Sequence, residues 1–142
     1  VDARRDEEFT YYSLTTLRAS MESYMNYLTH VLVITDACES GPSFYQAMRS
    51  DLKARNCADW RATQFKSSQV FSSAGYELAV DDSQFTRTFA SALRGNPKTC
   101  IAIEEIALQV TKAVTQNNQQ KPKFGKITGL KDEDGTFFFI KK

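Results

Sequence analysis

Hydrophobic residues recur along this chain in two ways, at helical spacing in some segments and as short continuous runs in others. From Leu14 they recur every three or four positions after Ser13, a residue type that favours a helix start, which predicts an amphipathic helix over 14–28. An apolar run over 31–34 follows, and we predict a strand over 30–36. Because this strand is apolar on both faces, we expect helices to cover it on both sides.

The rest of the chain continues the alternation of helices and strands. In chain order, the pattern predicts a helix over 44–55, a strand over 68–73, a helix between an Asp82 cap and a Gly95-Asn96-Pro97 stop, a helix over 103–114, a short strand over 124–128, an acidic turn over 132–135 and a final strand over 136–140. This order predicts an α/β fold with a mostly parallel sheet and helices on both faces. Nothing in it marks a domain boundary within residues 1–142.

Composition narrows the classes of protein that this chain can represent. A length of 142 residues is sufficient for one domain with a hydrophobic core, and 42% hydrophobic and 25% charged residues are typical of globular proteins. The net charge of +1, with scattered Lys and Arg, predicts no binding of nucleic acid or of an anionic membrane. No apolar run approaches the roughly 18 residues of a membrane span.

The three cysteines, Cys38, Cys57 and Cys100, are an odd number at unrelated spacings. This arrangement predicts free thiols in a reducing compartment, the cytoplasm, rather than a disulfide framework. Cys57 and Cys100 are interpreted as inert buried thiols, because no polar partner at a sheet edge accompanies either of them.

The most informative stretch is the end of the first predicted strand, which reads Thr35-Asp36-Ala37-Cys38-Glu39-Ser40-Gly41. Small and polar residues turn the backbone there, directly after a buried strand. Since ligands of α/β sheets bind at the carboxyl ends of strands, Cys38 is placed where a nucleophile is useful. The alternative interpretation is an inert thiol at a strand end.

Residues 36–41 resemble the nucleophile segment of the caspase-like cysteine peptidases, in the form Asp-x-Cys-x-Ser-Gly that metacaspases and their prokaryotic relatives carry. Three later segments are similar to downstream landmarks of that family, in the right order: Gln69-Val70-Phe71-Ser72-Ser73-Ala74, Asp82-Ser83-Gln84-Phe85-Thr86 and Pro122-Lys123-Phe124-Gly125. The resemblance covers most of the chain. It implies that residues 1–142 are the C-terminal portion of one caspase-like peptidase domain and supply only part of its sheet.

The resemblance also implies roles for individual residues. Cys38 is the expected nucleophile, and Asp36 is expected to line the pocket for the residue that precedes the scissile bond. An acid in that pocket predicts cleavage after Arg, with Lys second, through a charge-assisted bond. Ser72 and Ser73 are the expected pocket walls. Two alternatives stay open: Asp36 bonds only to backbone in the turn, and the two serines are ordinary strand-end residues.

The sole histidine of the chain, His30, is an unsuitable base for Cys38. Eight residues along a straight strand separate the two by about 26 Å, whereas a catalytic pair needs about 3 to 4 Å. The resemblance therefore implies that a companion chain or upstream segment supplies the catalytic His. It also implies autoprocessing of a longer product, of which this chain, beginning at Val1, would be one piece.

Three functional interpretations follow. The first is a cysteine endopeptidase acting on proteins or peptides with a basic residue before the cut. The alternative is a catalytically inactive caspase-like module for binding or regulation, and a third is a thiol-dependent enzyme of another class. No cofactor and no metal is predicted, although Asp81-Asp82 offers a possible calcium ligand of the kind that some metacaspases need. A helix cap explains Asp82 as well.

Overall fold

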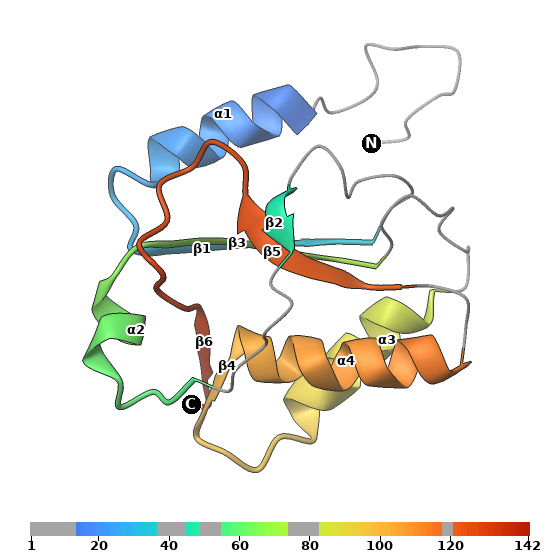
Figure 1. Cartoon of the computed structure of the whole chain (residues 1–142). Helices are drawn as coiled ribbons and strands as arrows, with labels where there is room; N and C mark the ends of the chain where they lie inside the picture. Colours follow the sequence, from blue (N-terminus) through green and yellow to red (C-terminus); the bar gives the residue numbers. More distant parts are fainter. Residues whose placement is uncertain (1–13, 37–44, 49–54, 74–82, 118–120) are drawn as a thin grey trace, which may run out of the picture.

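Helices and strands alternate along the chain, as the hydrophobic pattern predicts. The computed structural model in Figure 1 describes residues 14–36, 45–48, 55–73, 83–117 and 121–142. The helices are α1 (Leu14–Tyr24), α2 (Trp60–Gln64), α3 (Gln84–Arg94) and α4 (Ile103–Asn117). The strands are β1 (His30–Thr35), β2 (Tyr45–Met48), β3 (Ser67–Ser72), β4 (Cys100–Ala102), β5 (Lys123–Ile127) and β6 (Phe138–Ile140).

The main sheet has four strands in the order β1-β3-β5-β2. β1 and β3 are parallel, with a register that runs from His30 opposite Ser67 to Thr35 opposite Ser72. β5 is antiparallel to both β3 and β2. The expectation of a mostly parallel sheet is therefore wrong for the described strands. The reason is that two helices, α3 and α4, separate β3 from β5, so the chain returns to the end where β3 stopped and β5 runs backwards.

Helices cover both faces of this sheet, which confirms that part of the prediction (Figure 1). On one face, Met21 of α1 packs against Val70 of β3 and Ile127 of β5, with Val31 and Val33 of β1 beside them. The other face carries the larger core, which α3 and α4 build with the sheet. Its buried members are Phe71, Phe85, Ile101, Ile103, Ile106, Ala107, Val110, Val114 and Phe124.

The two parallel strands differ in burial. All six residues of β3 are buried, because it lies between β1 and β5 and under helices on both faces. β1 pairs with β3 alone among the described strands, and its side chains are half-buried, with Ile34 41% exposed. β1 is thus an apolar strand with one free edge within the described part of the sheet.

One predicted helix is a strand in the structure. Tyr45–Met48 form β2, which pairs with β5 from Tyr45 opposite Ile127 to Met48 opposite Gly125. The prediction of a helix over 44–55 is wrong for these residues, because pairing with β5 overrides a weak local helical pattern. Two further short strands, β4 and β6, pair with each other as an antiparallel ribbon below the main sheet in Figure 1. The sequence pattern predicts β6 and misses β4.

Two of the three cysteines form a disulfide. Cys57, which precedes α2, is bonded to Cys100 at the start of β4, with 6.3 Å between their Cα atoms. The prediction of free thiols is wrong for this pair, since the fold brings together residues 43 positions apart. Disulfides persist chiefly in oxidising compartments, so the cysteine count no longer supports a cytoplasmic location. None of the described helices is long and apolar enough to cross a membrane.

Candidate functional site

The predicted site lies at the carboxyl ends of the two parallel strands. Asp36 directly follows β1, and Ser73 directly follows β3. The backbone N–H of Ser73 donates a hydrogen bond to the carbonyl oxygen of Thr35 at 2.9 Å, which extends the ladder by one step. Asp36 and Ser73 are therefore neighbours at the carboxyl ends of β1 and β3. Cys38, the predicted nucleophile, lies outside the described residues.

Strand alternation separates the two predicted pocket serines. Ser73 shares the face of Phe71, which packs in the core with α3 and α4. Ser72 shares the face of Val70, which packs with α1. Asp36 lies on the α3 side, because its carboxylate contacts that helix. The structure thus brings Asp36 and Ser73 together and places Ser72 on the opposite face.

Asp36 binds the first turn of α3 through two hydroxyl groups. Ser83 Oγ donates to Oδ1 at 2.9 Å, and Thr86 Oγ1 donates to Oδ2 at 2.5 Å. Ser83 is also the N-cap of α3, since its Oγ accepts a hydrogen bond from the backbone N–H of Phe85 at 3.2 Å. The cap predicted at Asp82 is therefore wrong by one residue. The alternative that Asp36 bonds only to backbone in its own turn is wrong, because its partners include side chains at the start of α3.

These contacts keep the carboxyl group of Asp36 ionised. Partial burial raises the pKa of Asp36, but hydrogen bonds from the hydroxyls of Thr86 and Ser83 and from the backbone N–H of Thr86 lower it by more, so the net pKa lies below its ordinary value of 3.8. The buried hydroxyl of Ser73, which lies on the same side, has no hydrogen bond to a described residue. At neutral pH Asp36 therefore places a full negative charge at the carboxyl end of β1.

This charge has no counter-ion in the described part of the chain. The ion pairs found there join other residues, and the side chain of Asp36 is exposed to solvent. An oriented, ionised carboxylate is suited to a cationic ligand, and the unpartnered hydroxyl oxygen of Ser73 beside it can accept a further hydrogen bond. The arrangement therefore fits the recognition of a basic side chain.

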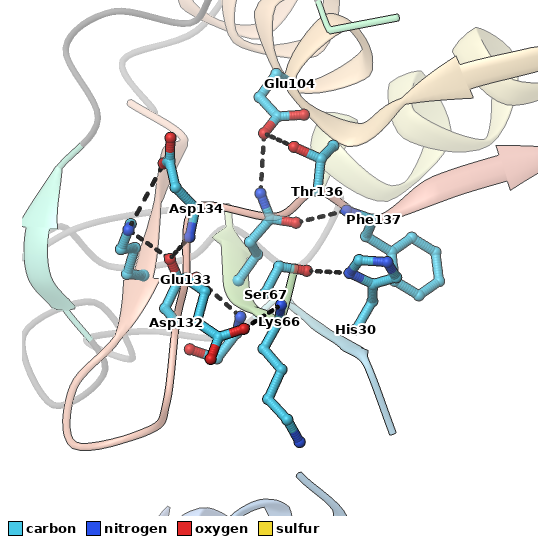
Figure 2. A network of polar contacts seen from close by, with 12 residues as sticks. His30, Lys66, Ser67, Glu104, Asp132, Glu133, Asp134, Thr136 and Phe137 are labelled. Carbon is cyan, nitrogen blue, oxygen red and sulfur yellow. Dashed lines mark hydrogen bonds and ion pairs between the residues drawn. The ribbon is translucent and has the colours of Figure 1, made fainter. Parts of the chain in front are cut away.

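His30 is the first residue of β1 and therefore lies at the opposite end of that strand from Asp36. Its Nε2 is 2.8 Å from the carbonyl oxygen of Thr63, which can only accept, so Nε2 carries the hydrogen. Its Nδ1 is 2.9 Å from Ser67 Oγ, which donates to it when the ring is neutral (Figure 2). Both ring nitrogens are thus occupied, and His30 is separated from Asp36 by the full length of β1. This agrees with the expectation that His30 is not the base.

Two shallow hollows are lined by described residues. One, of about 400 Å³, lies beside His30 and is lined mainly by apolar side chains, among them Leu28, Phe137 and Ile140. The other, of about 430 Å³, follows the exposed side of α3 along Gln84, Arg87, Thr88 and Ser91. The hollow along α3 is on the helix whose Ser83 and Thr86 bond to Asp36, whereas the hollow beside His30 is at the other end of β1.

A buried polar cluster joins β3 to α4 and to the segment before β6. Gln69 donates through Nε2 to Glu104 Oε1 at 2.9 Å and accepts from the backbone N–H of Phe137 at 2.9 Å. Thr136 Oγ1 donates to the same oxygen of Glu104 at 3.0 Å, and Glu104 is 1% exposed (Figure 2). The sequence analysis missed this cluster. The signal in the sequence was a glutamine directly before the apolar pair Val70-Phe71 of a predicted strand.

The acidic turn over 132–135 is attached to the start of β3 rather than free on the surface. Glu133 exchanges backbone and side-chain hydrogen bonds with Lys66, and Asp132 accepts from the backbone N–H of Ser68 at 2.9 Å. Asp132 also forms an ion pair with Lys126 (Figure 2). A hydrogen bond from Lys131, aided by the backbone N–H of Lys66, lowers the pKa of Glu133. These acids therefore stabilise the fold.

The described residues offer no metal site. No group of three or more His, Cys, Asp or Glu side chains comes together in these segments in a way that could hold an ion. Asp81 and Asp82, the possible calcium ligands, lie outside the described residues.

Comparisons of the chain with protein-family models, with curated proteins and with solved structures found no match. The family resemblance therefore stays a prediction that rests on the residues quoted for it.

Proposed function

We propose that this chain is the C-terminal part of a caspase-like cysteine endopeptidase domain that cleaves after Arg and, second, after Lys. The observation that carries the proposal is the exposed, ionised carboxylate of Asp36 at the carboxyl edge of a parallel strand pair, without a counter-ion among the described residues. Cys38 follows it by two positions in the sequence. A recognition group for a basic side chain and a potential nucleophile thus share one strand end.

The proposed reaction is acyl transfer. The thiolate of Cys38 attacks the carbonyl carbon of the peptide bond after the basic residue and forms a tetrahedral oxyanion. An imidazolium protonates the leaving amine as the carbon–nitrogen bond breaks, which leaves a thioester. Water, deprotonated by the same imidazole, then hydrolyses the thioester and regenerates the thiol. Asp36 binds the guanidinium or ammonium of the substrate throughout and sets the position of the cut.

The imidazole must come from outside this chain, because His30 is its sole histidine and is bonded at the far edge of the sheet. A companion chain or an upstream segment is the proposed source. The edge of β1 that no described strand covers supports this, since an apolar, half-buried strand with such an edge is a place where a further strand can add. In this proposal the sheet described here is part of a larger caspase-like sheet.

The experiment that tests the proposed function uses the chain together with any companion that copurifies. Fluorogenic peptides ending in Arg, Lys or Asp are compared, with Cys38→Ala as the matched control. Cleavage after Arg or Lys that disappears in Cys38→Ala supports the nucleophile and the acidic pocket together. Cleavage after Asp retains the nucleophile and contradicts the role of Asp36.

Absence of cleavage has to be interpreted with the composition of the sample known. If mass spectrometry shows a His-bearing companion and no peptide is cleaved, the proposed activity is contradicted and the binding or regulatory module becomes the better interpretation. If the companion is missing, the assay is repeated with the full-length gene product, which would contain both the catalytic His and Cys38.

A further inference from the structure

We propose that Ser83 and Thr86, at the start of α3, are positioning residues that orient the carboxylate of Asp36 for a guanidinium group. This inference rests on the proposed function and deepens it, because it assigns the preference for Arg over Lys to two hydroxyls on a separate element. Neither residue is expected to touch the reacting atoms. Both act through Asp36.

The geometry of the contact carries the inference. Each carboxylate oxygen of Asp36 accepts one hydroxyl hydrogen bond, Oδ1 from Ser83 at 2.9 Å and Oδ2 from Thr86 at 2.5 Å. An ionised carboxylate offers about four acceptor positions. The two hydroxyls and the backbone N–H of Thr86 use part of this capacity, and the carboxylate stays exposed to solvent, so a further donor can approach it. A guanidinium presents its N–H donors in a fixed plane, so its approach depends on how the carboxylate is oriented.

Orientation matters more for Arg than for Lys. A guanidinium is planar and binds through a fixed pair of donors, whereas an ammonium acts as a point charge that tolerates rotation of the carboxylate. An exposed Asp side chain without restraint would sample several rotamers. The two hydroxyls restrain it from both sides, so the geometric benefit is expected chiefly for Arg.

The first turn of α3 is itself fixed to the core. Phe85 lies between Ser83 and Thr86 in the sequence and is fully buried. Its ring packs against that of Phe71 of β3, with 4.8 Å between their centroids. The hydroxyls are therefore held at a constant position relative to β1 and β3, as a positioning role requires.

Ser73 gives an independent indication that a ligand approaches this edge. Its side chain is fully buried on the face of Asp36, and its hydroxyl has no regular hydrogen bond to a described residue. Buried hydroxyls are normally bonded, so a hydroxyl oxygen left without a partner beside a charged carboxylate is available to accept a hydrogen bond from a bound cationic group. Together the three hydroxyls and the carboxylate form a small recognition site from β1, β3 and α3.

The competing explanation is that Ser83 and Thr86 only attach α3 to the sheet. The test uses a pair of peptides that end in Arg or in citrulline, which has the shape of Arg without its charge. The ratio of kcat/KM for the two peptides isolates the contribution of the ionised Asp36, because both peptides use the same nucleophile and base. A purely structural role changes both rates equally and leaves the ratio constant.

Thr86→Val is the test variant, because it removes the hydroxyl and keeps the branched shape. Thr88→Val, on the same helix and lining the hollow on its exposed side, is the matched control. Thr86→Ser is the rescue variant, since it restores a hydroxyl at the same position. Ser83→Ala is less clean, because it also removes the cap of α3.

We expect Thr86→Val to lower the Arg-to-citrulline ratio by about 10-fold, the effect of one hydrogen bond to a charged group, with KM for the Arg peptide changing more than kcat. The ratio for Arg over Lys should fall as well. When the Arg-to-citrulline ratio is plotted against pH, the pH at which it falls on the acid side should be higher in Thr86→Val. The reason is that losing a donor destabilises the ionised form of Asp36 and raises its pKa. Thr86→Ser should restore the ratio, and Thr88→Val should leave it unchanged.

Two results would overturn the inference while leaving the proposed function intact. One is an unchanged Arg-to-citrulline ratio in Thr86→Val when Asp36→Asn abolishes the preference for Arg. The other is an equal loss of activity on both peptides. A wild-type preparation with its His-bearing companion that cleaves neither peptide overturns the proposed function, and the specificity role with it.

A readout that needs no catalysis completes the design. The carboxyl carbon of Asp36 is titrated by NMR in wild type, Thr86→Val and Thr88→Val. The inference requires a higher pKa of Asp36 in Thr86→Val than in the other two proteins. Equal pKa values in all three proteins would contradict it regardless of the peptide assays.

Discussion

The two ends of β1 differ in how their polar side chains are bonded. At the amino end, His30 has a partner at each ring nitrogen, and Lys66 and Glu133 bond to each other at the start of β3, although the buried hydroxyl of Ser68 has no partner among the described residues. At the carboxyl end, Asp36 is ionised, exposed and held by neutral groups of Ser83 and Thr86, beside the buried hydroxyl of Ser73. The carboxyl end thus has a charge without a counter-ion in the described segments.

This difference separates residues that stabilise the fold from residues that remain available to a ligand. Groups that bond to one another in the folded chain lower its free energy and have little left to offer to another molecule. A charged group that is oriented but not neutralised contributes little to stability and retains its interaction energy for binding. The contrast makes the carboxyl end the better candidate for a ligand site.

The largest expected effect concerns the disulfide on the amino side. Replacing both Cys57 and Cys100 by Ser should lower the free energy of unfolding by about 4 kcal/mol, because the bond closes a loop across a separation of 43 residues. Urea denaturation of the oxidised protein and the double variant measures the difference. Equal midpoints with the bond verified by mass spectrometry would show that this side does not hold the fold.

Gly135→Ala should be the next most damaging change on the amino side. A Cβ at Gly135 would overlap the carbonyl oxygen of Phe65, and the backbone N–H of Gly135 bonds to the carbonyl oxygen of Lys66 at 3.2 Å. We expect a loss of about 2 to 3 kcal/mol, since the backbone must move to relieve the overlap. Thermal unfolding monitored by circular dichroism checks it. Gly95→Ala, at the end of α3, serves as the milder comparison, because a Cβ there would lie 3.2 Å from the carbonyl oxygen of Ser91.

Asp36→Asn should affect the proposed function more than stability. The amide retains acceptors for Ser83 but loses the charge that binds a basic side chain, so kcat/KM for Arg peptides should fall roughly 10- to 100-fold. Peptides that end in citrulline should be cleaved at an unchanged rate. A parallel loss on both peptides would mean that the carboxyl end, too, is architectural.

His30→Ala tests the other half of the contrast. It leaves the carbonyl of Thr63 and the hydroxyl of Ser67 without their present partner, so stability should fall by about 1 to 2 kcal/mol. The kcat of the folded enzyme, measured well below its unfolding temperature with the companion present, should be unchanged. A loss of kcat without a loss of stability would give His30 a catalytic role that the geometry does not support.

The smallest expected effect distinguishes the causes of two lowered pKa values. Neutral hydroxyls lower the pKa of Asp36 below 3.8, whereas Lys131 is the main cause for Glu133, whose ordinary value is 4.5. Added salt should therefore raise the pKa of Glu133 and leave that of Asp36 nearly constant. NMR titration at low and high NaCl measures both.

The sign of the associated stability is the same for both groups. Each carboxyl is more acidic in the folded chain, so its contribution is present above the ordinary pKa and is lost as the pH falls through the lowered one. The difference in the free energy of unfolding between wild type and Asp36→Asn should be smallest below pH 3.8. A difference that grows with acidification would contradict the assignment for Asp36.

Much of the architecture was predictable from local pattern. The helical spacing of apolar residues identifies α1 and α4, and a continuous apolar run identifies β1, whereas β3 has a weaker pattern around Val70 and Phe71. β2 was mistaken for a helix and β4 was missed, because strands of four and three residues gain their stability from partners distant in sequence. The direction of β5 depends on how α3 and α4 return the chain, which no local pattern encodes.

The candidate site was predictable only at the ends of β1 and β3. Asp36 was identified from the resemblance of residues 36–41 to the metacaspase nucleophile segment, and its neighbour Ser73 from the end of the next strand. The contact with Ser83 and Thr86 joins residues almost fifty positions apart, so it depends on the packing of Phe85 against the sheet. Strand alternation would have separated Ser72 from Ser73 once the faces of β3 were known.

The Cys57–Cys100 bond also has a consequence for the integrity of the chain. A peptidase that encountered a scissile residue anywhere between positions 57 and 100 would produce two pieces that remain covalently attached. β3 and α3, which lie within this span, would stay with the rest of the molecule after such a cut. On a gel the cleaved chain would migrate as intact protein until a reductant separated the fragments.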